Sequence, residues 1–285
     1  MVRRLTLFAA LLAAACGGSP PRRAPSGPSP DADPEGPHRE LVAAAVRPYL
    51  DAELISGVAI GLLDAGRREI YGFGKGPGGA VPDGRSLFEL GSITKVYTGL
   101  LLADAIQRRE VELDAPVTDY LPPGVSVPTR DRTAITIRHL ALHSAGLPPL
   151  PPSAASLPPG DPFGRYDEDA LYRDLAQTEL AFAPGARIQS SNYGTGLLGF
   201  AIGRKLGTGY QKALEARILA PLELHDTYFT VPAAVAPRRL VGTDDELAAV
   251  PHWTWDALAA AGALSSTVRD QLRLLEAELD AAAGG

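Results

Sequence analysis

The sequence predicts a fold that combines a β-hairpin with a series of helices. Two strand-like runs, 57–63 and 69–74, flank the turn residues Asp64-Ala65-Gly66, and this pattern is typical of a hairpin. Apolar residues at helical spacing follow in most of the later segments. The chain has no internal repeat, which argues against a solenoid or propeller.

The individual helices are predicted from these apolar positions and from cap residues. One helix at 38–54 precedes the hairpin, and a second starts near Ser92 and continues through Ile106. Further helices are expected at 167–180, 197–206 and 214–222. A last helix follows residues 263–267, with an apolar stripe formed by Val268, Leu272, Leu275 and Leu279. Gly-rich residues 74–83 and Pro-rich residues 148–162 are expected to be loops.

Composition excludes several classes of protein. The 285 residues are 45% hydrophobic and 21% charged, enough for one substantial core. The net charge of −6 gives no basic footprint for nucleic acid. A single cysteine excludes an intramolecular disulfide.

The N-terminus has the pattern of an export signal. Residues 1–16 carry Arg3 and Arg4, a short apolar run and then small residues, which predicts a signal peptide. Cys16, the one cysteine, stands where a bacterial lipobox places the lipidated residue, and the alternative is an ordinary signal peptide cleaved nearby. Residues 17–37 are rich in Pro, Ser and Gly and are expected to be a linker to a folded domain at 38–285. We therefore expect a lipid-anchored protein of the bacterial cell envelope, at the periplasmic face of the outer membrane.

Ser92 and Lys95 form the first candidate site. Residues at i and i+3 lie on one face of a helix, so the hydroxyl and the amine can meet. Free N–H groups and the helix dipole favour negative charge at Ser92, and apolar neighbours lower the pKa of an amine at Lys95. The alternative is an exposed helix start with Ser92 as its N-cap and Lys95 in solvent.

His139 and His143 are spaced like a pair of zinc ligands on a helix. No glutamate follows the first histidine and no third ligand is marked, so we expect two structural histidines and no metal.

Several segments together resemble the serine β-lactamase and D,D-peptidase-like superfamily, and are most similar to its class C branch and the related esterases and D-aminopeptidases. The matching segments occur in the family's order and are 88–102, 113–121, 135–148, 182–199, 218–227 and 261–270. The resemblance implies an α+β fold with two subdomains, in which an antiparallel sheet is flanked by helices and a mostly helical subdomain is inserted after the first strands. It implies no cofactor.

The resemblance also implies a chemistry. Ser92 would be the acylated nucleophile, and Lys95 would take its proton or tune its neighbour. Ser190-Ser191-Asn192 would be the second motif, in which Ser190 shuttles a proton and Asn192 bonds Lys95 and a substrate amide. The partner would be a small molecule or peptide: a β-lactam, an ester or a cell-wall peptide. The oligomeric state is not predicted.

Two departures from the family pattern leave alternatives open. Ser190 stands where class C members carry a tyrosine, and a serine hydroxyl is a far weaker base. No Lys-Thr-Gly or His-x-Gly triplet follows Lys212, so we expect the chain to end before the strand that lines the site and supplies an oxyanion-hole N–H. The alternatives to an active hydrolase are a truncated, non-catalytic relative that binds cell-wall peptide or a partner strand, and a gene fragment.

Overall fold

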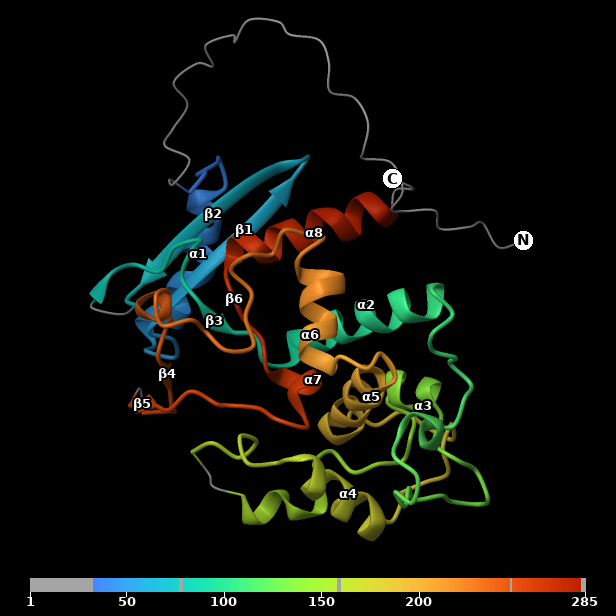
Figure 1. Cartoon of the computed structure of the whole chain (residues 1–285). Helices are drawn as coiled ribbons and strands as arrows, with labels where there is room; N and C mark the ends of the chain where they lie inside the picture. Colours follow the sequence, from blue (N-terminus) through green and yellow to red (C-terminus); the bar gives the residue numbers. More distant parts are fainter. Residues whose placement is uncertain (1–32, 77–78, 158–159, 247, 283–285) are drawn as a thin grey trace, which may run out of the picture.

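The computed structural model describes residues 33–76, 79–157, 160–246 and 248–282 (Figure 1). The predicted signal peptide, Cys16 and residues 17–32 of the predicted linker lie outside the described residues. The described residues form eight helices and three small antiparallel sheets, which confirms the α+β class. The helices are α1 (Arg39–Asp51), α2 (Thr94–Gln107), α3 (Ile137–Ala141), α4 (Glu168–Gln177), α5 (Asn192–Lys205), α6 (Tyr210–Leu214), α7 (Ala259–Gly262) and α8 (Val268–Ala282). The strands are β1 (Gly57–Asp64), β2 (Arg67–Gly74), β3 (Phe88–Glu89), β4 (Gly242–Thr243), β5 (Ala249–Val250) and β6 (Ser265–Ser266).

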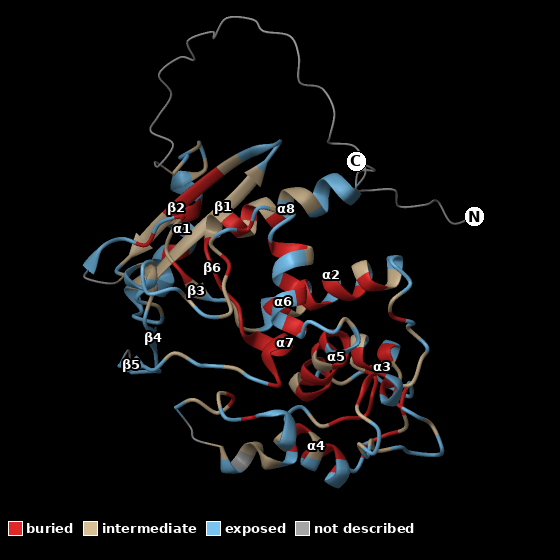
Figure 2. Ribbon diagram, in the orientation of Figure 1, coloured by how far each residue is buried: buried red, intermediate tan, exposed pale blue. Residues whose placement is uncertain are grey.

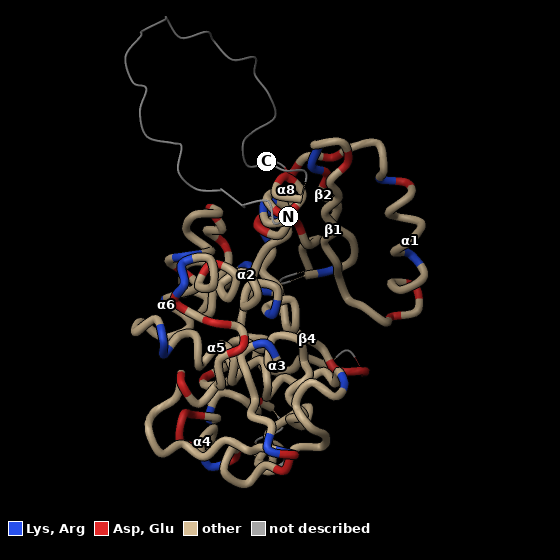
Figure 3. The backbone as a smooth tube through the Cα atoms, turned by 90° about the vertical axis from the view of Figure 1, so that its right-hand side faces the viewer, with Lys and Arg blue, Asp and Glu red and all other residues tan. Residues whose placement is uncertain are grey.

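The predicted hairpin is β1 and β2, paired in antiparallel register from Asp64 opposite Arg67 to Gly57 opposite Gly74. Its two-residue turn has both residues at positive φ, 49° at Ala65 and 78° at Gly66, the geometry that matches the twist of the strands. Alternate residues of β1 face opposite sides. Val58, Ile60 and Leu62 pack with α1, whereas Gly61 faces α8 (Figure 3).

Gly61 allows α8 to lie close to the hairpin. A Cβ at this position would come within 2.7 Å of Val268 Cγ1 and 2.9 Å of Leu272 Cγ. The predicted stripe on α8 is correct at these two positions and wrong at Leu275 and Leu279, which are 39% and 52% exposed. The face of α8 that meets the hairpin continues instead to Glu276, four residues after Leu272, which forms an ion pair with Arg68 of β2. Leu275 and Leu279 are therefore left exposed.

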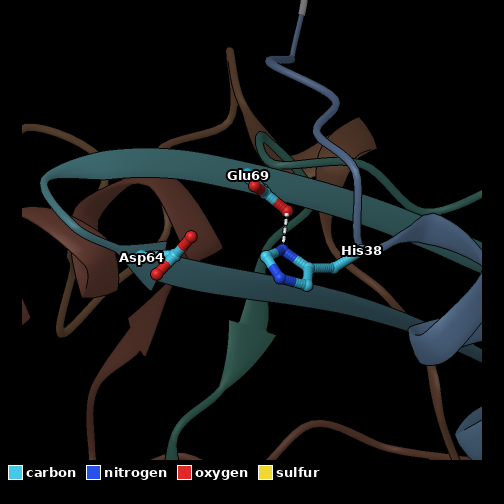
Figure 4. Close-up of side chains that lie close together, drawn as sticks. All are labelled: His38, Asp64 and Glu69. Atoms are coloured by element: carbon cyan, nitrogen blue, oxygen red, sulfur yellow. Dashed lines mark hydrogen bonds and ion pairs between the residues drawn. The ribbon is translucent and has the colours of Figure 1, made fainter.

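The segment before α1 is fastened to β2 by a buried carboxylate. Glu69 accepts hydrogen bonds from Tyr71 Oη at 2.6 Å and pairs with His38 Nδ1 at 2.8 Å (Figure 4). Tyr71 Oη in turn accepts the backbone N–H groups of Gly36 and His38. The hydrogen bond from Tyr71 holds the pKa of Glu69 below its usual value, and His38 acts in the same direction. The last residues of the predicted linker are therefore attached to the domain.

His38, Glu69 and Asp64 also form a group with metal-ligand side chains, their ligand atoms within 4.8 Å of one another (Figure 4). Two protein partners already occupy one carboxylate oxygen of Glu69, and Asp64 pairs with Arg67 at 3.0 Å. These contacts account for one oxygen of Glu69 and for Asp64, whereas the buried Oε1 of Glu69 has no hydrogen-bond partner among the described residues.

The main core surrounds α2 and α5, where the buried residues concentrate (Figure 2). Fully buried side chains of these helices include Tyr97, Leu101, Tyr193, Leu197 and Ile202. Two glycines of α5 let α7 approach closely: a Cβ at Gly196 would lie 2.3 Å from Leu258 Cδ2, and one at Gly199 would lie 2.1 Å from Ala260 Cβ. No helix among the described residues is both long enough and apolar enough to cross a membrane.

We expect Gly199→Ala to lower the free energy of unfolding by about 1–3 kcal/mol, because the added methyl overpacks the contact between α5 and α7. Urea unfolding measures this change. Gly99→Ala on α2 is the matched control: its Cβ would meet nothing within 4 Å, so the better helix propensity of alanine should raise stability by about 0.5–1 kcal/mol. Equal stability of Gly199→Ala and the parent protein would contradict the packing argument.

Candidate active site

Ser92 lies in a 3₁₀ turn, Gly91–Ile93, that leads directly into α2. Gly91 has φ of 50°, which lets the chain turn sharply from β3 into this helix. Lys95 follows one turn later, and its Nζ lies 2.9 Å from Ser92 Oγ. The spacing therefore brings the hydroxyl and the amine together, as expected from the sequence.

Lys95 is not the solvated lysine of the alternative interpretation. Its side chain is half-buried, and its Nζ also donates to the carbonyl oxygen of Ala261 at 2.8 Å. Burial lowers the pKa of this ammonium below its usual value of 10.5, because a charged amine loses hydration there. A neutral amine beside a hydroxyl can accept its proton, which is the arrangement of an activated nucleophile.

A second segment delivers Ala261 to the site. β6 pairs with β3, with Phe88 opposite Ser266 and Glu89 opposite Ser265. Leu264 continues this pairing: its carbonyl accepts from Leu90 N–H at 2.8 Å, and its N–H donates to Thr94 Oγ1 at 3.2 Å. The carbonyl of Ala261 is thereby held against the amine of Lys95.

A pocket of about 370 Å³ opens beside Ser92. It is lined by Glu89, Gly91, Ser92, Asn192, Val250, Pro251, Trp253, Trp255, Ala261, Gly262 and Ala263. Trp255 stacks on Phe163 at 4.4 Å between ring centroids, and Trp253 meets the same ring edge-on at 5.4 Å. The pocket thus has the hydroxyl of Ser92 on one side and an aromatic wall on the other. A larger pocket of about 720 Å³, next to α5 and α6, contains none of the predicted site residues.

The second predicted motif begins α5. Ser191 is the N-cap, because its Oγ accepts the N–H of Gly194 at 2.8 Å, and Asn192 lines the pocket with Ser92. Ser190 is exposed and is not among the residues that line the pocket. The structure therefore brings Ser92 and Asn192 to one pocket, with Lys95 hydrogen-bonded to Ser92, and it does not bring Ser190 to that pocket.

The two histidines bind backbone groups. His139 Nδ1 accepts the N–H of Thr136 at 3.2 Å, and Thr136 Oγ1 accepts the N–H of His139, so the pair caps α3. His143 Nδ1 accepts the N–H of Ser191 at 3.3 Å; burial lowers the pKa of this ring, and the charge of Lys95 lowers it further. Sequence reasoning missed that His143 lies next to the site. Lys95 and Ser191, which lie near it, belong to distant segments of the sequence, so no local pattern indicates that these residues meet.

Protein-family models show to which family this chain is similar. The model described as Beta-lactamase matches residues 42–284. The chain belongs to the beta-lactamase family. This confirms, at the level of the family, the resemblance inferred from the motifs.

This chain is similar to part of the length of several known proteins. The beta-lactamase of Escherichia coli (strain K12) is 29% identical over 247 residues, which cover 84% of this chain and 61% of that protein. The D-alanyl-D-alanine-carboxypeptidase/endopeptidase AmpH of the same strain is 31% identical over 223 residues, 78% of this chain and 57% of that protein. The beta-lactamase of Lysobacter lactamgenus is 27% identical over 287 residues, 98% of this chain and 68% of that protein. The chain thus spans about three fifths of the length of the two E. coli relatives.

Proposed function

We propose that this chain is a serine hydrolase that acts by acylation of Ser92, with Lys95 as the base. The observation that carries the proposal is the 2.9 Å distance from Lys95 Nζ to Ser92 Oγ at the edge of a substrate-sized pocket. The lowered pKa of Lys95 supports it, since a base has to be free of its proton before it can accept another.

The proposed reaction has two steps. In the first, the Ser92 proton moves to the neutral amine of Lys95 while Oγ attacks the substrate carbonyl, and the leaving oxygen or nitrogen takes the proton from Lys95 as its bond to the carbonyl carbon breaks. An ester or peptide then releases this group, whereas in a ring-opened β-lactam it stays attached to the acyl group. In the second, water attacks the acyl-serine ester, which frees Ser92 and releases the acid. Asn192, at the same pocket, is proposed to donate its amide N–H to the substrate.

The substrate is proposed to be a β-lactam, an ester or a D-amino-acid peptide. The relatives include beta-lactamases and a D-alanyl-D-alanine-carboxypeptidase/endopeptidase. All three substrate classes present a carbonyl to a serine nucleophile, so one acylation site serves each of them. Incubation of the purified chain with a fluorescent penicillin and with an activated ester, read as covalent labelling and as hydrolysis, tests the proposal. Saturable binding of cell-wall peptide without labelling or turnover would support the non-catalytic alternative instead.

Ser190→Ala tests the proposed proton relay. A group that transfers a proton in the rate-limiting step contributes roughly 10²-fold to 10⁴-fold. Ser190 is exposed and outside the pocket, so we expect a change in kcat of less than about threefold, measured with the ester. A loss of about 10²-fold or more would instead place Ser190 in the relay.

The lipid anchor at Cys16 and a position at the cell envelope stay predictions from the sequence. If they hold, residues 17–32 would tether the described domain to the membrane surface.

A further inference from the structure

The residues that follow α3 are joined to the residues that precede α5 by a series of hydrogen bonds. Three backbone N–H groups of 181–189 donate to carbonyls of 143–146: Ala181 to Gly146 at 2.9 Å, Gly185 to Ser144 at 2.8 Å and Gln189 to His143 at 2.8 Å.

Two further hydrogen bonds hold the first residues of α5. Ser191 Oγ donates to the carbonyl of Pro148 at 2.6 Å, and Asn192 N–H donates to that of Pro149 at 2.9 Å. The segment after α3 therefore positions the start of α5, where Asn192 enters the pocket.

His143 takes part in this series with both its backbone and its ring. Its carbonyl binds Gln189, and its Nδ1 accepts the N–H of Ser191 at 3.3 Å. The residue has φ of 54°, in the left-handed region, which turns the chain out of α3. A nitrogen that accepts an N–H carries no proton, so the proton of the neutral ring is assigned to Nε2.

We propose that His143 is a positioning residue for acylation: its neutral ring holds Ser191, and with it Asn192, in place beside Ser92 and Lys95, and protonation of the ring releases them. The effect on catalysis rests on the proposed function, whereas the hydrogen bond to Ser191 does not.

Protonation breaks this contact because Nδ1 becomes a donor that faces the donor N–H of Ser191. Burial lowers the pKa of His143 below 6.5, and the positive charge of Lys95 on α2 lowers it further. Other titratable and charged groups on the packed segments are already engaged: His139 binds Thr136, Arg138 pairs with Asp114, and Arg187 lies over the ring of Phe182. The ring is therefore expected to be neutral above pH 6.5 and to gain its proton below it.

Two substitutions distinguish the role of His143 as a hydrogen-bond acceptor from its ability to gain a proton. His143→Asn keeps an acceptor, since Oδ1 of asparagine corresponds to Nδ1, and asparagine tolerates positive φ, but it does not titrate. His143→Leu removes both the acceptor and the titratable group. His225→Asn, at an exposed histidine, is the matched control.

Initial rates on the activated ester are measured from about pH 5 to 9 for these variants, with circular dichroism and thermal melting at each pH. We expect His143→Leu to lose kcat about 10-fold to 100-fold with KM changed less than about threefold, because Asn192 is displaced from the reacting atoms. His143→Asn should stay within about threefold of the parent near pH 8.5. Below pH 6.5 the slope of log(kcat/KM) against pH should rise from about one to about two in the parent and in His225→Asn, and stay near one in His143→Asn.

Two kinetic results would overturn the inference: full kcat in a folded His143→Leu, or a steepening in His143→Asn equal to that of the parent. Melting decides the case even if the parent hydrolyses nothing. A base whose pKa is lower in the folded state stabilises the fold less as pH falls, so the parent should lose more of its melting temperature below pH 6.5 than His143→Asn. If both proteins lost the same melting temperature, the proposed hydrogen bond between His143 and Ser191 would be contradicted. If Ser92 were not labelled, only the proposed function would be contradicted.

Discussion

Ser92→Ala is expected to abolish covalent labelling by a fluorescent penicillin and to lower the rate of ester hydrolysis by roughly 10⁶-fold, as removal of a serine nucleophile does in other hydrolases. The physical reason is that Oγ of Ser92 is the atom to which Lys95 Nζ is hydrogen-bonded at the pocket. Without it, Lys95 has no hydroxyl to deprotonate, and no acyl-enzyme forms. In-gel fluorescence and intact-protein mass measure the adduct, and initial rates measure the hydrolysis.

The fold should survive this change. Ser92 is exposed, so the substitution is expected to alter the free energy of unfolding by less than about 0.5 kcal/mol. Ser156→Ala, at another exposed serine, is the control and should label like the parent. An adduct of equal yield in Ser92→Ala, or one mapped by peptide sequencing to a different residue, would show that Ser92 is not the nucleophile.

Features that depend on near neighbours in the chain were predictable from the sequence. The hairpin follows from the two strand-like runs that flank the turn residues Asp64-Ala65-Gly66. The meeting of Ser92 and Lys95 follows from helical geometry alone, because residues three apart share a face whatever surrounds them. In each case the distance between the groups is set by local backbone geometry.

Features that depend on distant segments were not predictable. Lys95 and Ala261 are 166 positions apart, and no pattern near either residue indicates their hydrogen bond. The α8 stripe failed for a related reason: Leu274, outside the stripe, is 6% exposed, whereas Leu275 is 39% exposed. Apolar residues at helical spacing do not say which face of a helix meets a partner that lies far away in the sequence.

Lys95→Met should leave Ser92 in place and still lower the rate of acylation, by about 10²-fold to 10⁴-fold, which is the usual contribution of a general base. Methionine has nearly the length of the lysine stem and no amine, so the pocket keeps its shape while Ser92 Oγ loses its proton acceptor. In the parent the rate should rise with pH as Lys95 loses its proton, and burial places that rise below 10.5. Lys95→Met should lack this rise.

Stability distinguishes this result from misfolding. Because burial disfavours the charged amine, its removal relieves a desolvation penalty, and Lys95→Met should melt within about 4 °C of the parent even though its bonds to Ser92 and Ala261 are gone. Lys212→Met, at an exposed lysine on α6, should keep both the parent rate and its pH profile. If Lys95→Met acylated as fast as the parent over the whole pH range, the base would have to be another group. His143, whose pKa is lowered by burial and by the charge of Lys95, would then be the first residue to substitute in the Lys95→Met protein.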